Sequence, residues 1–113
     1  MEAKNTCIVF GAAGYIGRHL VGYLADSGFN IKAYDLNDTI ESFDCDYSSI
    51  DISNAWELKG IDWNVEYVFM FAGVTGTWNG FDNYDKYVKV NEIGLQHVLH
   101  EIVKSEFRPR IVY

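Results

Sequence analysis

Three glycines at positions 11, 14 and 17 form the most distinctive spacing in the sequence, within Phe10-Gly11-Ala12-Ala13-Gly14-Tyr15-Ile16-Gly17. Gly11 allows a sharp turn after an apolar run, Gly14 leaves room for a bulky anion, and Gly17 allows a helix to pack closely. The unpaired N–H groups and positive dipole end at the start of a helix attract phosphate groups. Because glycines cluster in many turns, this spacing is informative only between a strand and a helix.

Asp35 lies 18 residues after Gly17, at the end of the next apolar run. A carboxylate there can accept hydrogen bonds from both hydroxyls of an adenosine ribose whose diphosphate lies on the glycine turn. Since a 2′-phosphate would meet like charge, we predict NAD as the cofactor rather than NADP. The simpler interpretation, an aspartate that merely ends a strand, remains open. We expect Arg18 to be exposed in the first helical turn rather than to bind a 2′-phosphate.

The elements that must position these residues follow from the alternation of apolar runs and helical stripes. We predict strands at Cys7–Phe10, Phe29–Tyr34, Ile50–Ile52, Tyr67–Phe71 and from Arg110 onward. Predicted helices run from Tyr15 to Ser27, ended by Gly28; from about Ala55 to Lys59, capped by Ser53; and from Tyr84 to Ser105. Helices between strands imply a parallel sheet, and right-handed crossovers give the order 3-2-1-4-5. The fold class is therefore α/β, a doubly wound Rossmann-type sheet.

Composition excludes several kinds of partner. With 113 residues, 49% of them hydrophobic, the chain can form one packed domain. The net charge of −7 disfavours nucleic acid and anionic membrane surfaces. No apolar run is long enough to span a bilayer, and the N-terminus lacks the features of a signal peptide. We therefore expect a cytoplasmic protein in which Cys7 and Cys45 are reduced core thiols.

With these residues in place, the chain resembles the extended short-chain dehydrogenase/reductase family, the NAD-dependent epimerases and dehydratases of nucleotide sugars. Four motifs carry the resemblance over nearly the whole chain: the glycine turn, Asp51-Ile52, Phe71-Ala72-Gly73 and Val90-Asn91-Glu92-Ile93-Gly94. The resemblance implies that Asp51-Ile52 contacts the adenine ring and that Phe71–Gly73 passes beside the cofactor. The cofactor-binding residues predicted in this way are Gly11, Ala13, Gly14, Tyr15, Ile16, Gly17, Asp35, Leu36, Asp51, Ile52, Phe71, Ala72, Gly73 and Asn91.

Asn91 also stands out on physical grounds. It falls within the apolar stripe of the last helix, formed by Tyr84, Val88, Leu95, Val98 and Ile102. An amide on a buried face needs hydrogen-bond partners, or it costs about 1–3 kcal/mol. Either it is a purely structural amide, or, as the resemblance implies, it supports the active site. The stripe itself fits packing on the sheet and also a homodimer interface, so the oligomeric state stays open.

The family's catalytic groups are not in this sequence. The resemblance implies hydride transfer assisted by a tyrosine and a lysine in a YxxxK arrangement on the fifth strand and the following helix. No such pattern occurs in the expected place, and Tyr113 belongs to the predicted strand. We therefore predict that 1–113 is the NAD(P)-binding part of a longer enzyme that binds nucleotide sugars, inactive by itself. The alternative is a non-catalytic dinucleotide-binding regulator or redox sensor.

Three other groups of residues carry side chains that could bind or react. His97 and His100 could face one metal ion, but no third ligand is clearly placed, so no metal site is predicted. Thr75, Thr77, Trp78 and Asn79 follow the fourth predicted strand, where they either border the nicotinamide or sugar or form an ordinary loop. Tyr84 and Tyr87 are expected to pack rather than to catalyse.

Overall fold

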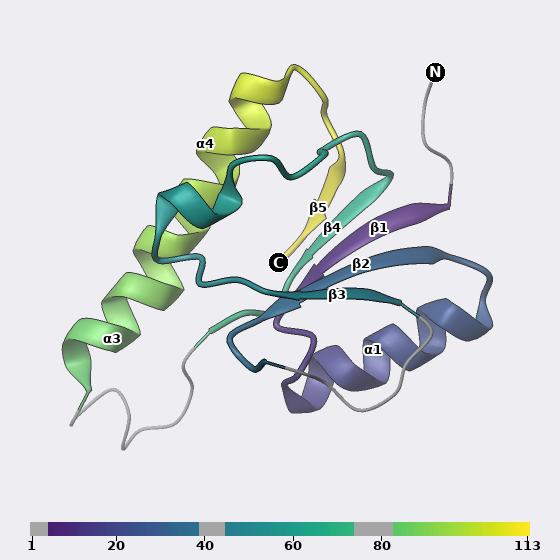
Figure 1. Cartoon of the computed structure of the whole chain (residues 1–113), viewed down its shortest axis with the longest axis horizontal. Helices are drawn as coiled ribbons and strands as arrows, with labels where there is room; N and C mark the ends of the chain where they lie inside the picture. Colours follow the sequence, from purple (N-terminus) through teal and green to yellow (C-terminus); the bar gives the residue numbers. More distant parts are fainter. Residues whose placement is uncertain (1–4, 39–44, 74–82) are drawn as a thin grey trace.

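The computed structural model describes residues 5–38, 45–73 and 83–113. Within them, five parallel strands form one sheet in the order β3-β2-β1-β4-β5, as predicted (Figure 1). The strands are β1 (Thr6–Phe10), β2 (Asn30–Asp35), β3 (Asp46–Ser49), β4 (Tyr67–Met70) and β5 (Arg110–Val112). The helical elements are α1 (Tyr15–Asp26), the 3₁₀ helix η1 (Ala55–Leu58), α3 (Tyr84–Val88), the π-helical segment η2 (Lys89–Gly94) and α4 (Leu95–Ser105).

The sheet separates two hydrophobic clusters, one on each face. α1 covers one face, while α3, η2, α4 and η1 lie on the other (Figure 1). Ile8 and Phe10 of the central strand β1 pack in the cluster of the α4 side, and Cys7 and Val9 pack in the cluster of the α1 side. This alternation buries both faces of β1, which explains why its sequence is a continuous apolar run.

The first strand–helix–strand unit agrees with the prediction. α1 buries Val21 and Leu24 against the sheet and ends at Asp26. Gly28 follows with φ +86, a left-handed conformation that a glycine adopts without steric penalty. The turn therefore brings the chain directly into β2, which pairs with β1 from Thr6↔Asn30 to Phe10↔Tyr34.

The third strand was predicted in the wrong place. β3 is Asp46–Ser49, paired with β2 from Lys32↔Asp46 to Asp35↔Ser49, whereas Ile50–Ile52 lie beyond it. Its sequence, DYSS, is polar because β3 is an edge strand with a solvated side, so hydrophobicity does not reveal it. Ile52 is instead buried against the hydrophobic cluster on the α4 side.

The cap of the following helix was also predicted one residue too early. η1 is a single 3₁₀ turn, and the side chain of Asn54, not Ser53, accepts the Trp56 N–H at 3.2 Å. Ser53 instead donates its N–H and O–H to Asp51 Oδ1. Both residue types suit a cap, so the sequence alone does not separate them.

The long predicted helix is present from Tyr84 to Ser105, but its middle is π-helical. Val98 and Ile102 pack on the sheet as expected, with Leu95 half-buried beside them. Tyr84, predicted to pack, is 67% exposed. A π segment places more residues per turn, so the buried face before it does not continue the stripe of α4. Instead, η2 buries Val90 and Gly94.

Two further observations concern the whole described chain. No helix in the described ranges is both long and apolar enough to cross a membrane. Cys7 is buried and Cys45 half-buried, and both are thiols rather than disulfide partners. Burial, with a further contribution from the Glu66 carboxylate, raises the pKa of the Cys7 thiol to about 11.

Candidate functional site

The glycine turn joins the end of β1 to the start of α1. Gly11 has φ +90, and an added Cβ would overlap the backbone of Phe71 and Ala72 at the end of β4. Its N–H donates to the Tyr34 carbonyl at 2.8 Å, which fixes the turn to β2. A Cβ on Gly17 would overlap the Gly11 carbonyl, so α1 packs directly on the turn. Two of the three predicted glycine roles are thus visible in the backbone.

Gly14 occupies a different environment. It is the exposed N-cap residue of α1, and no side chain caps the helix. An added Cβ would approach only the Gly11 carbonyl oxygen, at 3.3 Å, so its outer side is open. Tyr15 and Ile16 beside it are 73% and 65% exposed. The start of α1 therefore offers its first N–H groups to the surface, an arrangement that suits an anion.

Asp35 points toward the glycine turn, as predicted. It ends β2, and its Oδ2 accepts the Ala13 N–H at 2.8 Å while its Oδ1 accepts the Leu36 N–H at 2.7 Å. An ionised carboxylate has about four acceptor positions, so each oxygen can take a further hydrogen bond from a ligand hydroxyl. The structure thus holds a fixed carboxylate next to the anion-binding turn.

Two side chains of β3 hold the segment after Asp35. Tyr47 donates its hydroxyl hydrogen to the Asn37 carbonyl, and Ser49 donates to the Leu36 carbonyl at 3.0 Å. Burial and the Asp35 and Asp38 carboxylates raise the pKa of Tyr47, so its phenol stays neutral and remains a donor. The polar sequence of β3 therefore positions the residues that follow the carboxylate.

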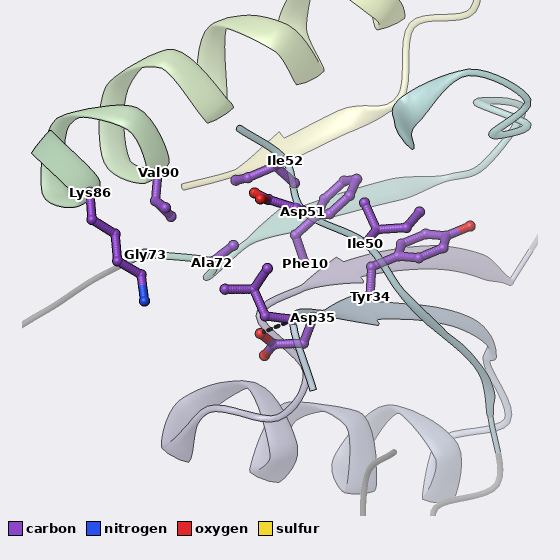
Figure 2. A pocket seen from close by; sticks show the side chains of 11 residues that line it. Phe10, Tyr34, Asp35, Ile50, Asp51, Ile52, Ala72, Gly73, Lys86 and Val90 are labelled. Carbon is purple, nitrogen blue, oxygen red and sulfur yellow. Dashed lines mark hydrogen bonds between the residues drawn. The ribbon is translucent and has the colours of Figure 1, made fainter. Parts of the chain in front are cut away.

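A pocket of about 100 Å³ opens beside Asp35 at the carboxyl edge of the sheet. Figure 2 shows Asp51 and Ile52 on one side of it and Asp35 on the other, with Ala72 between them. Six predicted cofactor-binding residues line this pocket: Asp35, Leu36, Asp51, Ile52, Ala72 and Gly73. They come from three separate strand ends. A hollow of about 380 Å³ shares Leu36, Asp51, Lys86 and Val90 with the pocket, so the two form one groove.

The remaining walls of the pocket were not predicted. They are formed by Phe10, Tyr34, Ile50, Lys86 and Val90. The Phe10 and Tyr34 rings stack with centroids 5.3 Å apart, and burial together with the Asp46 and Asp62 carboxylates raises the pKa of Tyr34. The alternation along β1 could have placed Phe10 on this face. Nothing in the sequence marks Lys86, which reaches the pocket from α3.

Ile52 and Asp51 are held in different ways. Asp51 Oδ1 accepts the Ser53 N–H at 2.9 Å and the Ser53 hydroxyl at 2.6 Å. Ile52 is buried beside Gly94, where an added Cβ would lie 2.6 Å from Ile52 Cγ1. The last glycine of the Val90–Gly94 motif is therefore explained by the close approach of η2 to this wall.

Asn91 lies against the segment that follows β4. A Cβ on Gly73 would lie 2.9 Å from Asn91 Oδ1, so the half-buried amide and the Gly73 backbone are close neighbours. The contact is compatible with a structural amide and with support of the site. Phe71 differs from its neighbours because its ring stacks on Phe69 at 6.2 Å, while its N–H donates to the Phe10 carbonyl. Its side chain is not among those lining the pocket.

The histidines of α4 form no such arrangement in the described part of the chain. Within the described residues, no group of three His, Cys, Asp or Glu side chains could hold a metal ion. His97 Nδ1 lies 2.8 Å from the Ile52 carbonyl oxygen. The loop residues Thr75, Thr77, Trp78 and Asn79 lie outside the described residues.

Comparison with known proteins establishes the family. A profile described as the NAD dependent epimerase/dehydratase family matches residues 7–113. The chain belongs to this family. No curated protein matches the sequence.

Several solved protein structures are similar to the chain. Epimerase Mth375 from Methanothermobacter thermautotrophicus is 28% identical, with a TM-score of 0.79 over 89% of this chain and 32% of that one. MoeE5, in complex with UDP-glucuronic acid and NAD, is 27% identical, with a TM-score of 0.78 over 94% and 35%. UDP-glucose 4-epimerase from Brucella ovis, in complex with NAD, is 25% identical, with a TM-score of 0.78 over 89% and 33%. The chain spans about a third of the length of these structures.

Proposed function

We propose that residues 1–113 are the NAD(H)-binding part of an epimerase or dehydratase that acts on a nucleotide sugar. One observation carries the proposal. Asp35 accepts a hydrogen bond from Ala13 in the glycine turn and also lines the pocket formed by Asp51-Ile52 and Ala72-Gly73. Residues from four separate segments thus meet at one end of the sheet, where ligands bind in open α/β folds.

The residues present fit a dinucleotide. The open backbone at Gly14, with the N–H groups at the start of α1, suits the diphosphate. Asp35 would accept the hydroxyls of the adenosine ribose, and the groove along Leu36 and Asp51 would take the adenine. When bound, NAD supplies the hydride acceptor for the family's chemistry. The fixed carboxylate would disfavour a 2′-phosphate.

The nucleotide-sugar part of the proposal is supported by similarity. MoeE5, which is 27% identical over most of this chain, has been solved with both UDP-glucuronic acid and NAD. Since no YxxxK pattern occurs in the sequence, we propose that residues 1–113 alone bind NAD weakly and turn over no sugar. Formation of an epimerised or oxidised sugar from UDP-glucose by the purified chain with NAD would contradict this part. The cytoplasmic location is proposed from sequence pattern, and the apolar stripe of the last helix is compatible with a homodimer.

The cofactor preference is tested with Asp35→Asn. Loss of a hydrogen bond to a charged group is worth about 1.5–3 kcal/mol, so NAD should bind about 10-fold to 100-fold more weakly to the variant. Titration calorimetry with NAD and NADP measures the change. Asp26→Asn, at the exposed end of α1, is the matched control and should bind NAD like the unaltered chain. A preference of the unaltered chain for NADP would overturn the role given to Asp35.

A further inference from the structure

The Asp51–Ile52 wall of the pocket is not part of the sheet. β3 ends at Ser49, and the last ladder-like contact is the Ile50 N–H donating to the Asp35 carbonyl at 2.8 Å. Beyond it, the Asp51 N–H donates to Glu57 Oε1 at 3.1 Å, a contact within the same loop. The wall therefore needs support from another element to keep its place against the pocket.

α4 supplies such support through His97. Its Nδ1 lies 2.8 Å from the carbonyl oxygen of Ile52, a contact that joins residues 45 positions apart. Because a carbonyl oxygen only accepts, Nδ1 carries the hydrogen and donates. The side chain is half-buried, which limits the access of water to this bond. The backbone of the wall is thus tied directly to the helix that covers the sheet.

The same helical run also holds the side chain of Ile52. Gly94 lies three residues before His97, which puts both on one face of the helix. The approach at Gly94 is so close that an added Cβ would lie 2.6 Å from Ile52 Cγ1. Ile52 therefore contacts η2 through its side chain and α4 through its carbonyl oxygen.

A second link, between the residue after η1 and α4, is weaker. Lys59, just after η1, donates to Glu101 of α4 at 3.2 Å, but the lysine side chain is 46% exposed. Exposed ion pairs of this kind contribute little because solvent screens them. The pair also attaches to Lys59 rather than to Asp51 or Ile52, whereas His97 contacts the wall directly.

We propose that His97 is a positioning residue that holds Asp51-Ile52 against the base-binding end of the pocket. This inference rests on the proposed function, because it takes the adenine of NAD as the ligand of that wall. A carboxylate at the edge of a base favours an amino group over a carbonyl oxygen, since it can only accept. Correct placement of Asp51 should therefore appear as a preference for NAD over its hypoxanthine analogue.

Two variants separate hydrogen bonding from packing. His97→Leu keeps an apolar side chain of similar size and removes the donor. His97→Asn retains a donor, because the Asn Nδ2 is attached to Cγ as the His Nδ1 is. His100→Leu, which changes an exposed histidine of the same helix, is the matched control. We expect NAD to bind about 5-fold to 10-fold more weakly to His97→Leu, and to bind His97→Asn and His100→Leu within about 2-fold of the unaltered chain.

Two measurements complete the test. Calorimetry with NAD and with nicotinamide hypoxanthine dinucleotide should show that His97→Leu loses most of the preference for adenine. Amide hydrogen exchange without ligand should rise at residues 50–55 in His97→Leu and return to its ordinary rate in His97→Asn. Unchanged exchange in His97→Leu, or failure of His97→Asn to restore it, overturns the positioning role. Absence of NAD binding by the unaltered chain overturns the proposed function and the adenine preference instead. The exchange data still decide whether His97 holds the wall.

Discussion

Gly14 and Gly17 lack side chains for different physical reasons, although they lie three residues apart. Gly17 packs its Cα against the Gly11 carbonyl, where no Cβ fits, so its absence of a side chain serves the fold. Gly14 faces the surface, so its absence of a side chain is not required by the neighbouring backbone. The spacing in the sequence indicates that both glycines matter to the turn, but only the structure separates the structural role from the proposed binding role.

Substitution by alanine should separate these roles. Gly17→Ala places a Cβ against backbone and should lower the free energy of unfolding by about 1–3 kcal/mol, the usual range for overpacking. Gly14→Ala should lower the free energy of unfolding by less, about 0.5–1 kcal/mol, because glycine is preferred to alanine at an N-cap. It should also weaken NAD binding by crowding the diphosphate. Urea unfolding and calorimetry measure the two effects. If Gly17→Ala is as stable as the unaltered chain, the packing argument fails.

The buried thiol of Cys7 makes stability depend on pH. Burial raises its pKa from the ordinary 9.0 to about 11, so the folded state favours the neutral thiol. This contribution to stability is complete below pH 9 and is lost as the pH rises through 11. The unfolding free energy should therefore fall more steeply between pH 9 and 11 in the unaltered chain than in Cys7→Ala. Urea unfolding at several pH values measures both slopes. The pKa of Tyr34 is also raised, but its contribution to the slope is the same in both proteins because both contain it. Equal slopes would contradict this account.

At the scale of elements, local pattern predicted the buried parts well and misplaced the edge strand β3. β1 and α1 agree with prediction because a continuous apolar run and a helical stripe report burial directly. β3 was misplaced because an edge strand needs no such run, so the apolar pair at Ile50 and Ile52 was mistaken for it. The π segment η2 was not predicted, because the apolar stripe was continued through Lys89–Gly94 with an α-helical period.

The contact between η2 and the pocket wall gives a prediction at this scale. Gly94→Ala should destabilise the chain by about 1–3 kcal/mol, because its Cβ would lie 2.6 Å from Ile52 Cγ1. In the Ile52→Ala background Cγ1 and Cδ1 are gone, and the Cβ that remains lies 3.4 Å from the added atom, so the same substitution should cost clearly less. A double-mutant cycle by urea unfolding measures this coupling. Additive effects of the two substitutions would show that the contact does not limit the packing.

At the scale of the whole molecule, the sheet brings distant segments to one edge. The carboxyl ends of β1, β2 and β4 supply the glycine turn, Asp35 and Ala72-Gly73, and the chain after β3 adds Asp51-Ile52. Sequence motifs predicted these residues because each carries a local signal. Phe10, Tyr34 and Lys86 were missed because they become neighbours only when the sheet and α3 assemble. The chain spans about a third of the similar structures, so chemistry on a sugar remains a proposal.

The central claim is that NAD lies across this edge, from the glycine turn to Asp51-Ile52. Titration of the isotope-labelled chain with NAD, followed by amide chemical shifts, tests it most directly. We predict shifts at Ala13, Tyr15, Ile16, Leu36, Ile52 and Gly73, with little change at Thr6 and Asn30, which line a hollow at the opposite, amino end of the strands. Shifts confined to that opposite end, or no shifts at saturating NAD, would contradict the account.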